Sequence, residues 1–61
     1  MRYGELKKLL KESGCRKVSE GAKHEKWESP KTNRAFRVGR HNAQEVPAGT
    51  LNSILKDAGI K

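Results

Sequence analysis

Apolar residues recur at helical spacing in the first segment of the chain. Tyr3, Leu6 and Leu10 fall on one stripe of a helix, while charged residues occupy the other stripes (Glu5, Lys7, Lys8, Lys11 and Glu12). Gly14 supplies the left-handed residue that commonly follows a helix, and Cys15 stands where an apolar contact is favoured. The pattern predicts a helix over residues 4–13, with Cys15 as a small core residue and not a reactive thiol.

The middle third of the chain changes from helical spacing to the alternation of β-strands. Strands are predicted over residues 15–20, 24–29 and 34–40, separated by the turn-prone segments 21–23 and 30–33. If Trp27, Phe36 and Val38 form the inward set, the alternation places a basic set on the outward face: Lys17, His24, Lys26 and Arg37. Trp27 could stack on a nucleobase, but its position in the alternation favours burial.

A second helix is indicated near the end of the chain. Leu51, Ile54, Leu55 and Ala58 form one apolar stripe, and Gly59 is suited to end the helix. Pro47 suits its first turn, whereas Thr50 as N-cap would shorten it by about a turn. The element order predicts an α+β fold, α-β-β-β-α, with two helices on one face of a three-stranded antiparallel sheet. We expect a single domain over residues 1–61.

Positive charge is concentrated in the strand region. Lysine and arginine number 14 against 7 acidic residues, a formal charge of +7, and residues 16–40 hold eight basic and three acidic residues. Such a field attracts polyanions, nucleic acid first and anionic membrane second, although a solvated basic surface that keeps the protein soluble is the alternative. No apolar run approaches a membrane span and the start lacks a signal-peptide core, so we expect a soluble, cytoplasmic protein.

Few residues are candidates for chemistry. The single cysteine cannot form an internal disulfide, and neither metal-ligand spacing nor a phosphate-binding loop is present, so no cofactor or metal is expected. His24, at a strand start on a basic face, could take the proton from a ribose 2′-hydroxyl or protonate the leaving 5′-oxygen, although a surface histidine near a turn is the alternative. His41 could be a second acid/base group, but a structural or phosphate-contacting role is favoured.

Three segments resemble the HicA (YcfA-like) toxins of toxin–antitoxin pairs: "GAKHEKW", "FRVGRHNAQEV" and "GTLNSILKDAGI". The resemblance runs nearly end to end. It implies a fold like that of double-stranded-RNA-binding domains, cleavage of mRNA with growth arrest, and neutralisation by a HicB-type antitoxin. It also implies that His24 is catalytic. The basic residues around it are the candidate RNA contacts: Lys17, Lys23, Lys26, Arg37, Arg40 and His41.

Two departures from the related patterns affect these expectations. Gly39 stands where many HicA relatives have proline, and we expect it to loosen the end of its strand. The second helix has only Lys56, near its end, and not the lysine cluster of double-stranded-RNA-binding domains. Single-stranded RNA is therefore the expected substrate. A non-catalytic RNA-binding module that uses the same basic face is the alternative function.

Overall fold

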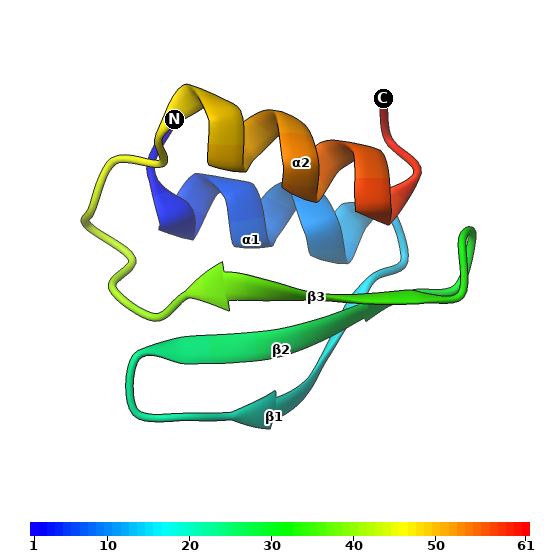
Figure 1. Cartoon of the computed structure of the whole chain (residues 1–61), viewed down its shortest axis with the longest axis horizontal. Coiled ribbons are helices and arrows are strands. Elements are labelled where there is room, and N and C mark those ends of the chain that lie inside the picture. The colour runs from blue at the N-terminus through cyan, green and yellow to red at the C-terminus, as the bar shows by residue number, and fades with distance from the viewer.

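The computed structural model describes residues 1–61 and has the predicted element order (Figure 1). A helix is followed by three antiparallel strands in the order β1-β2-β3 and by a second helix. Both helices lie on the same side of the sheet, with β1 farthest from them. The elements are α1 (Tyr3–Glu12), β1 (Arg16–Glu20), β2 (His24–Ser29), β3 (Arg34–Gly39) and α2 (Ala48–Ala58).

Glycines end both helices, as the sequence predicts. Gly14 and Gly59 have φ of 91° and 79°, in the left-handed region that glycine enters without a steric penalty. The backbone N–H of Ile60 then donates to the carbonyl of Leu55 at 3.0 Å, which folds the chain end back on α2. The shorter alternative for α2 is wrong, because Pro47 is its N-cap and the helix begins at Ala48.

The core lies between the helices and one face of the sheet. Along β2, Glu25, Trp27 and Ser29 are buried in alternation, and they contact both helices. The Glu25 carboxylate accepts a hydrogen bond from Lys7 of α1, and the Ser29 hydroxyl donates to the carbonyl of Ala58 of α2 at 2.7 Å. The apolar core is made of ten residues: Tyr3, Leu6, Leu10, Cys15, Trp27, Phe36, Val38, Val46, Ile54 and Ala58. Burial of Trp27 and Cys15 is thus confirmed.

A β-bulge in β1 overturns the predicted face of Lys17. Lys17 is directly opposite Trp27, and the register then shifts so that Ser19 is opposite Lys26. Residues paired directly across two strands share a face, so Lys17 lies on the helix side of the sheet and not beside His24 and Lys26. Its side chain is nevertheless exposed, as are all residues of β1, because this strand lies farthest from the helices (Figure 1).

Gly39 keeps its place at the end of β3, where it pairs with His24 of β2. A Cβ atom at this position would lie 2.7–2.9 Å from three atoms of the Tyr3 ring, which is closer than real side chains approach one another. The Tyr3 ring therefore occupies the space that a side chain at position 39 would need. The glycine does not loosen the strand end but lets the start of α1 pack against it.

Candidate functional site

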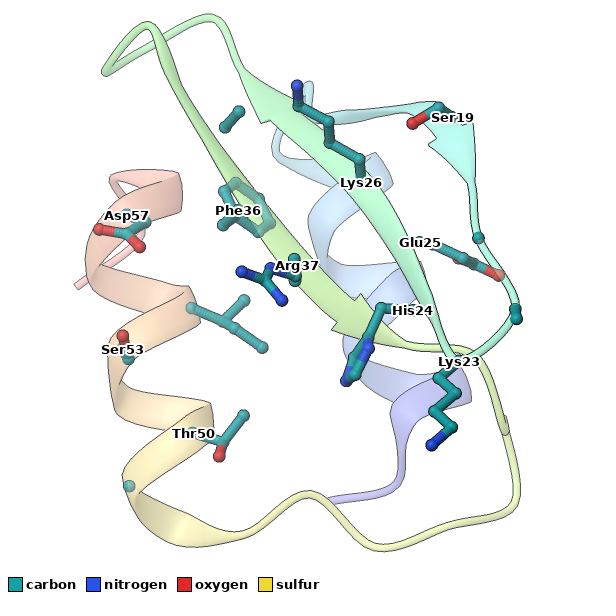
Figure 2. A pocket seen from close by; sticks show the side chains of 15 residues that line it. Ser19, Lys23, His24, Glu25, Lys26, Phe36, Arg37, Thr50, Ser53 and Asp57 are labelled. Carbon is teal, nitrogen blue, oxygen red and sulfur yellow. The ribbon is translucent and has the colours of Figure 1, made fainter.

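A groove of about 870 Å³ runs along β3, which is an edge strand of the sheet (Figure 2). It lies between α2 and the open face of the sheet, the face that the helices do not cover. Its sheet side holds the turn before β2 together with side chains of β2 and β3, and its other side is formed by Gly49, Thr50, Ser53 and Asp57 of α2. Phe36 and Ile54, both largely buried in the core, line it between these two sides. The groove is open to solvent along its length and is of a size suited to a small ligand or a segment of a polymer.

His24 stands at one end of this groove. It is the first residue of β2, is exposed, and has no hydrogen bond from its imidazole to another residue of the chain. Its backbone is fixed, because the N–H of Gly21 donates to the His24 carbonyl at 2.8 Å and closes the β1–β2 turn. The ring nitrogens of His24 are therefore free, while its backbone is fixed in place. A group that transfers protons to or from a substrate requires both features.

Three cations beside His24 have no carboxylate partner. Lys23 precedes it in the turn, and Lys26 and Arg37 lie directly opposite each other on the open face of β2 and β3. None of the three forms a salt bridge or a side-chain hydrogen bond. The acidic residues of this region are paired elsewhere: Glu20 with Lys17 and Arg40, Glu25 with Lys7, and Glu28 with Arg16. Of the basic residues between Arg16 and Arg40, four have no carboxylate partner, and all of these except Lys31 line the groove, where their charge attracts an anion.

A buried polar network lies on the opposite face of β2. The Lys7 ammonium donates to Glu25 Oε2 at 3.1 Å, to Asn42 Oδ1 at 2.6 Å and to the Arg40 carbonyl at 3.3 Å. Glu25 Oε1 accepts from the Trp27 indole at 3.0 Å. Burial by itself raises the pKa of Glu25, but the hydrogen bonds from Trp27 and Lys7 and the charge of Lys7 outweigh it and hold that pKa below its ordinary value.

This network is a structural feature that the sequence pattern did not predict. Helical spacing places Lys7 on a polar stripe of α1, yet only 11% of its side chain is exposed, because it crosses to β2. The network joins α1, the strand that carries His24 and the loop that follows β3. It fixes the backbone next to His24, and Glu25 is its one member that also lines the groove.

Comparison with models of protein families shows the family of the chain. The family model of the HicA toxin of bacterial toxin–antitoxin systems matches residues 3–60, a range that includes every groove residue. The chain belongs to the HicA toxin family. No curated protein and no solved structure matches the chain. Membership of the HicA family gives the chain a toxin role and implies an antitoxin partner.

The HicA fold brings only some of the predicted RNA contacts together. Lys23, Lys26 and Arg37 line the groove with His24, whereas Lys17, Arg40 and His41 do not. Lys17 Nζ lies 3.2 Å from Glu20 Oε1 on the other face of the sheet. His41 is exposed in the loop after β3.

Arg40 holds the turn from which His24 emerges. Its Nη1 donates to the carbonyls of Gly21 and Ala22 at 3.3 and 3.4 Å, and its Nη2 lies 3.9 Å from Glu20. The Arg40 backbone N–H also donates to the Lys23 carbonyl at 3.3 Å. In this HicA chain, Arg40 is therefore placed to position the turn and not to lie beside a ligand in the groove.

The α2 side of the groove was not predicted as part of the site. Gly49 and Thr50 belong to the "GTL" segment that carries the HicA resemblance, so the motif indicated that these residues matter. The spacing within the motif does not show which element they face.

No group of three or more His, Cys, Asp or Glu side chains is arranged to hold a metal ion. No helix is long and apolar enough to cross a membrane.

Proposed function

We propose that this HicA toxin is an endoribonuclease that cleaves mRNA, with His24 as a general acid/base. The observation that supports this most directly is the groove itself. An exposed histidine with free ring nitrogens stands beside three cations, Lys23, Lys26 and Arg37, that lack carboxylate partners. Histidine is the side chain that most often serves as a general acid or base in enzymes, and unpaired cations suit a phosphodiester.

The reaction we propose is transfer of the phosphodiester to the neighbouring ribose. The 2′-oxygen attacks the phosphorus while the bond from phosphorus to the 5′-oxygen breaks, giving a 2′,3′-cyclic phosphate and a 5′-hydroxyl. His24 takes the proton of the 2′-hydroxyl or gives one to the departing 5′-oxygen, and water makes the other proton transfer. Lys26 and Arg37, opposite each other in register, stabilise the extra negative charge on the phosphorane oxygens. No step of this scheme uses a metal ion.

Replacement of the histidine tests this proposal. His24→Ala should lower the rate of RNA cleavage by about 10²–10⁴-fold, the usual contribution of a general acid/base group, and should abolish growth arrest. The fold should persist, because the side chain is exposed. Thermal unfolding of the variant provides the control. If His24→Ala cleaves RNA at the wild-type rate, His24 is not the catalytic residue. If the purified wild type binds RNA and never cuts it, the protein is a non-catalytic RNA-binding module.

We further propose that the antitoxin is HicB-type and covers the groove. Unpaired cations on an open surface favour an acidic partner, and a standard interface buries about 800 Å² on each protein. Competition tests this: saturating antitoxin should displace RNA from the His24→Ala variant. Simultaneous binding of RNA and antitoxin would mean that inhibition acts by another route.

A further inference from the structure

The two sides of the groove differ in charge. The sheet side carries the three unpaired cations and His24, whereas the α2 side carries no cation (Figure 2). Thr50, Ser53 and Asp57 follow one another at intervals of three and four residues, so they form a single stripe of α2. The neighbouring stripe of the helix, with Ile54 and Ala58, enters the core.

This asymmetry gives a bound polynucleotide one favoured orientation. Phosphates are drawn to the unpaired cations Lys23, Lys26 and Arg37, whereas the α2 side lines the groove with no cation. The one charged group on that side, the carboxylate of Asp57, is paired with Arg34 at 3.5 Å. The uncharged part of a nucleotide, its ribose and base, is then left to face the helix. Phe36 and Ile54 provide an apolar surface between the two sides, which suits the flat, weakly polar face of a base.

The hydroxyls of the α2 side are free to bind a ligand. Thr50 and Ser53 are exposed, and neither hydroxyl has a hydrogen-bond partner in the chain, although helical serine and threonine often bond to a carbonyl of the preceding turn. Each hydroxyl can both donate and accept, as the edges of bases and the ribose hydroxyls require. Both residues line the groove, and in Figure 2 the Thr50 side chain points from α2 toward the sheet side.

Gly49 has no explanation within the protein itself. It lies in the first turn of α2 with ordinary helical backbone, since the only glycines of positive φ are Gly14 and Gly59. A Cβ atom at Gly49 would meet nothing within 4 Å, so packing does not demand a glycine there. Glycine in a helix is less favourable than alanine, and close approach of a ligand to the backbone is one reason to keep it. Gly49 lines the groove, where such an approach would occur.

We propose that the α2 side of the groove recognises the nucleoside part of the RNA and so determines which nucleotide is cut. In this arrangement Gly49 admits the nucleotide close to the helix backbone, and the Thr50 and Ser53 hydroxyls bond to the edge of its base. The inference rests on the proposed ribonuclease activity, because it assigns the groove's second side to the same substrate.

The decisive variant is Gly49→Ala, because its effects on stability and on activity should be opposite. Alanine should raise the thermal unfolding midpoint, since it favours the helix and meets no neighbour. On a short single-stranded RNA the variant should raise KM about tenfold or more, as an added methyl in a closely packed contact does. The matched control is Gly4→Ala, the corresponding position in the first turn of α1, whose Cβ would be 3.4 Å from Asn42 and which does not line the groove. It should leave KM unchanged.

The hydroxyls are tested by their effect on cleavage-site preference. Thr50→Val and Ser53→Ala should each change relative cleavage of oligonucleotides that differ only in the base at the cut by about two- to tenfold, the effect of one hydrogen bond. Asn52→Ala, on α2 but outside the groove, should leave the preference as it is. Unchanged KM in Gly49→Ala together with unchanged preference in both hydroxyl variants would overturn the inference, while a wild-type protein that cuts and a His24→Ala variant that does not would leave the proposed function standing.

Discussion

The Lys7 ammonium lies 3.1 Å from Oε2 of Glu25, and the two side chains are only 11% and 8% exposed. Both charged groups are largely removed from solvent, so the stability of each charge depends on the other and on the hydrogen bonds around them. Glu25 also satisfies the Trp27 indole, and Lys7 also bonds to Asn42. The pair therefore acts as one unit that connects α1 to the strand of His24.

Removal of one partner of this pair should be costly. Glu25→Ala leaves the buried Lys7 ammonium without its counter-charge and the Trp27 indole N–H without its acceptor. It should lower the free energy of unfolding by about 3–5 kcal/mol. The measurement is chemical denaturation, or loss of far-ultraviolet circular dichroism if the variant does not fold. Replacement of both charges, Lys7→Met with Glu25→Leu, should recover most of the loss. Glu28→Ala, which breaks an exposed pair with Arg16, is the control and should change stability by at most about 1 kcal/mol.

Stability should depend on pH through the same carboxyl group. Its pKa is lower in the folded protein than in the unfolded chain, so its contribution is complete above the unfolded-state pKa. The contribution is lost as the pH falls from the ordinary carboxyl range through the lower, folded-state pKa. Glu25→Gln should therefore show a flatter decline of the unfolding free energy over this acidic range than the wild type. An equally steep decline in both proteins would assign the acid sensitivity to other carboxyls.

The salt dependence of RNA binding should distinguish cations inside the groove from those outside it. Each phosphate contact to a single strand contributes about −0.7 to the slope of log K against log salt. In the His24→Ala background, Lys26→Ala or Arg37→Ala should flatten the slope by roughly this amount, since both cations are unpaired in the groove. Lys17→Ala, on the other face and paired with Glu20, should change it less. Equal effects from Lys26 and the exposed helix residue Lys11 would mean a diffuse basic surface without a defined RNA path.

The ends of the RNA products report on the proposed chemistry. Attack by the 2′-hydroxyl leaves a 2′,3′-cyclic phosphate or, after hydrolysis, a 3′-phosphate, together with a 5′-hydroxyl. Excess EDTA should leave the rate unchanged, because the scheme assigns proton transfer to His24 and charge stabilisation to Lys26 and Arg37. Strict dependence on magnesium with 3′-hydroxyl products would exclude this mechanism.

Local patterns in the sequence predicted the elements and the core with few errors. Strand alternation identified Trp27, Phe36 and Val38 as inward, and all three are buried. The glycines after each apolar stripe marked both helix ends, because a left-handed residue there is a local requirement. These features depend on neighbours within one turn or one strand, which a single sequence contains.

The errors concern relationships between distant segments. The bulge after Lys17 changes which residues oppose one another in β1 and β2, and alternation within one strand cannot report it. Burial of Lys7 depends on Glu25, 18 residues away, so helical spacing alone makes it a surface residue. The contribution of Gly49 and Thr50 to the groove arises only when α2 packs beside β3.

The close fit between Tyr3 and Gly39 has a consequence for the order in which a newly made chain becomes functional. The start of α1 is held by residues that are synthesised much later: the N–H of Tyr3 donates to the Gln44 carbonyl and that of Gly4 to the Asn42 carbonyl, both at 3.0 Å. During translation α1 therefore leaves the ribosome long before the residues that hold its first turn have been made. The groove is completed later still, because α2, which forms its second side, follows all three strands in the chain. A chain interrupted before residue 48 presents His24 on an incomplete groove, so the groove assembles only after α2 has been made.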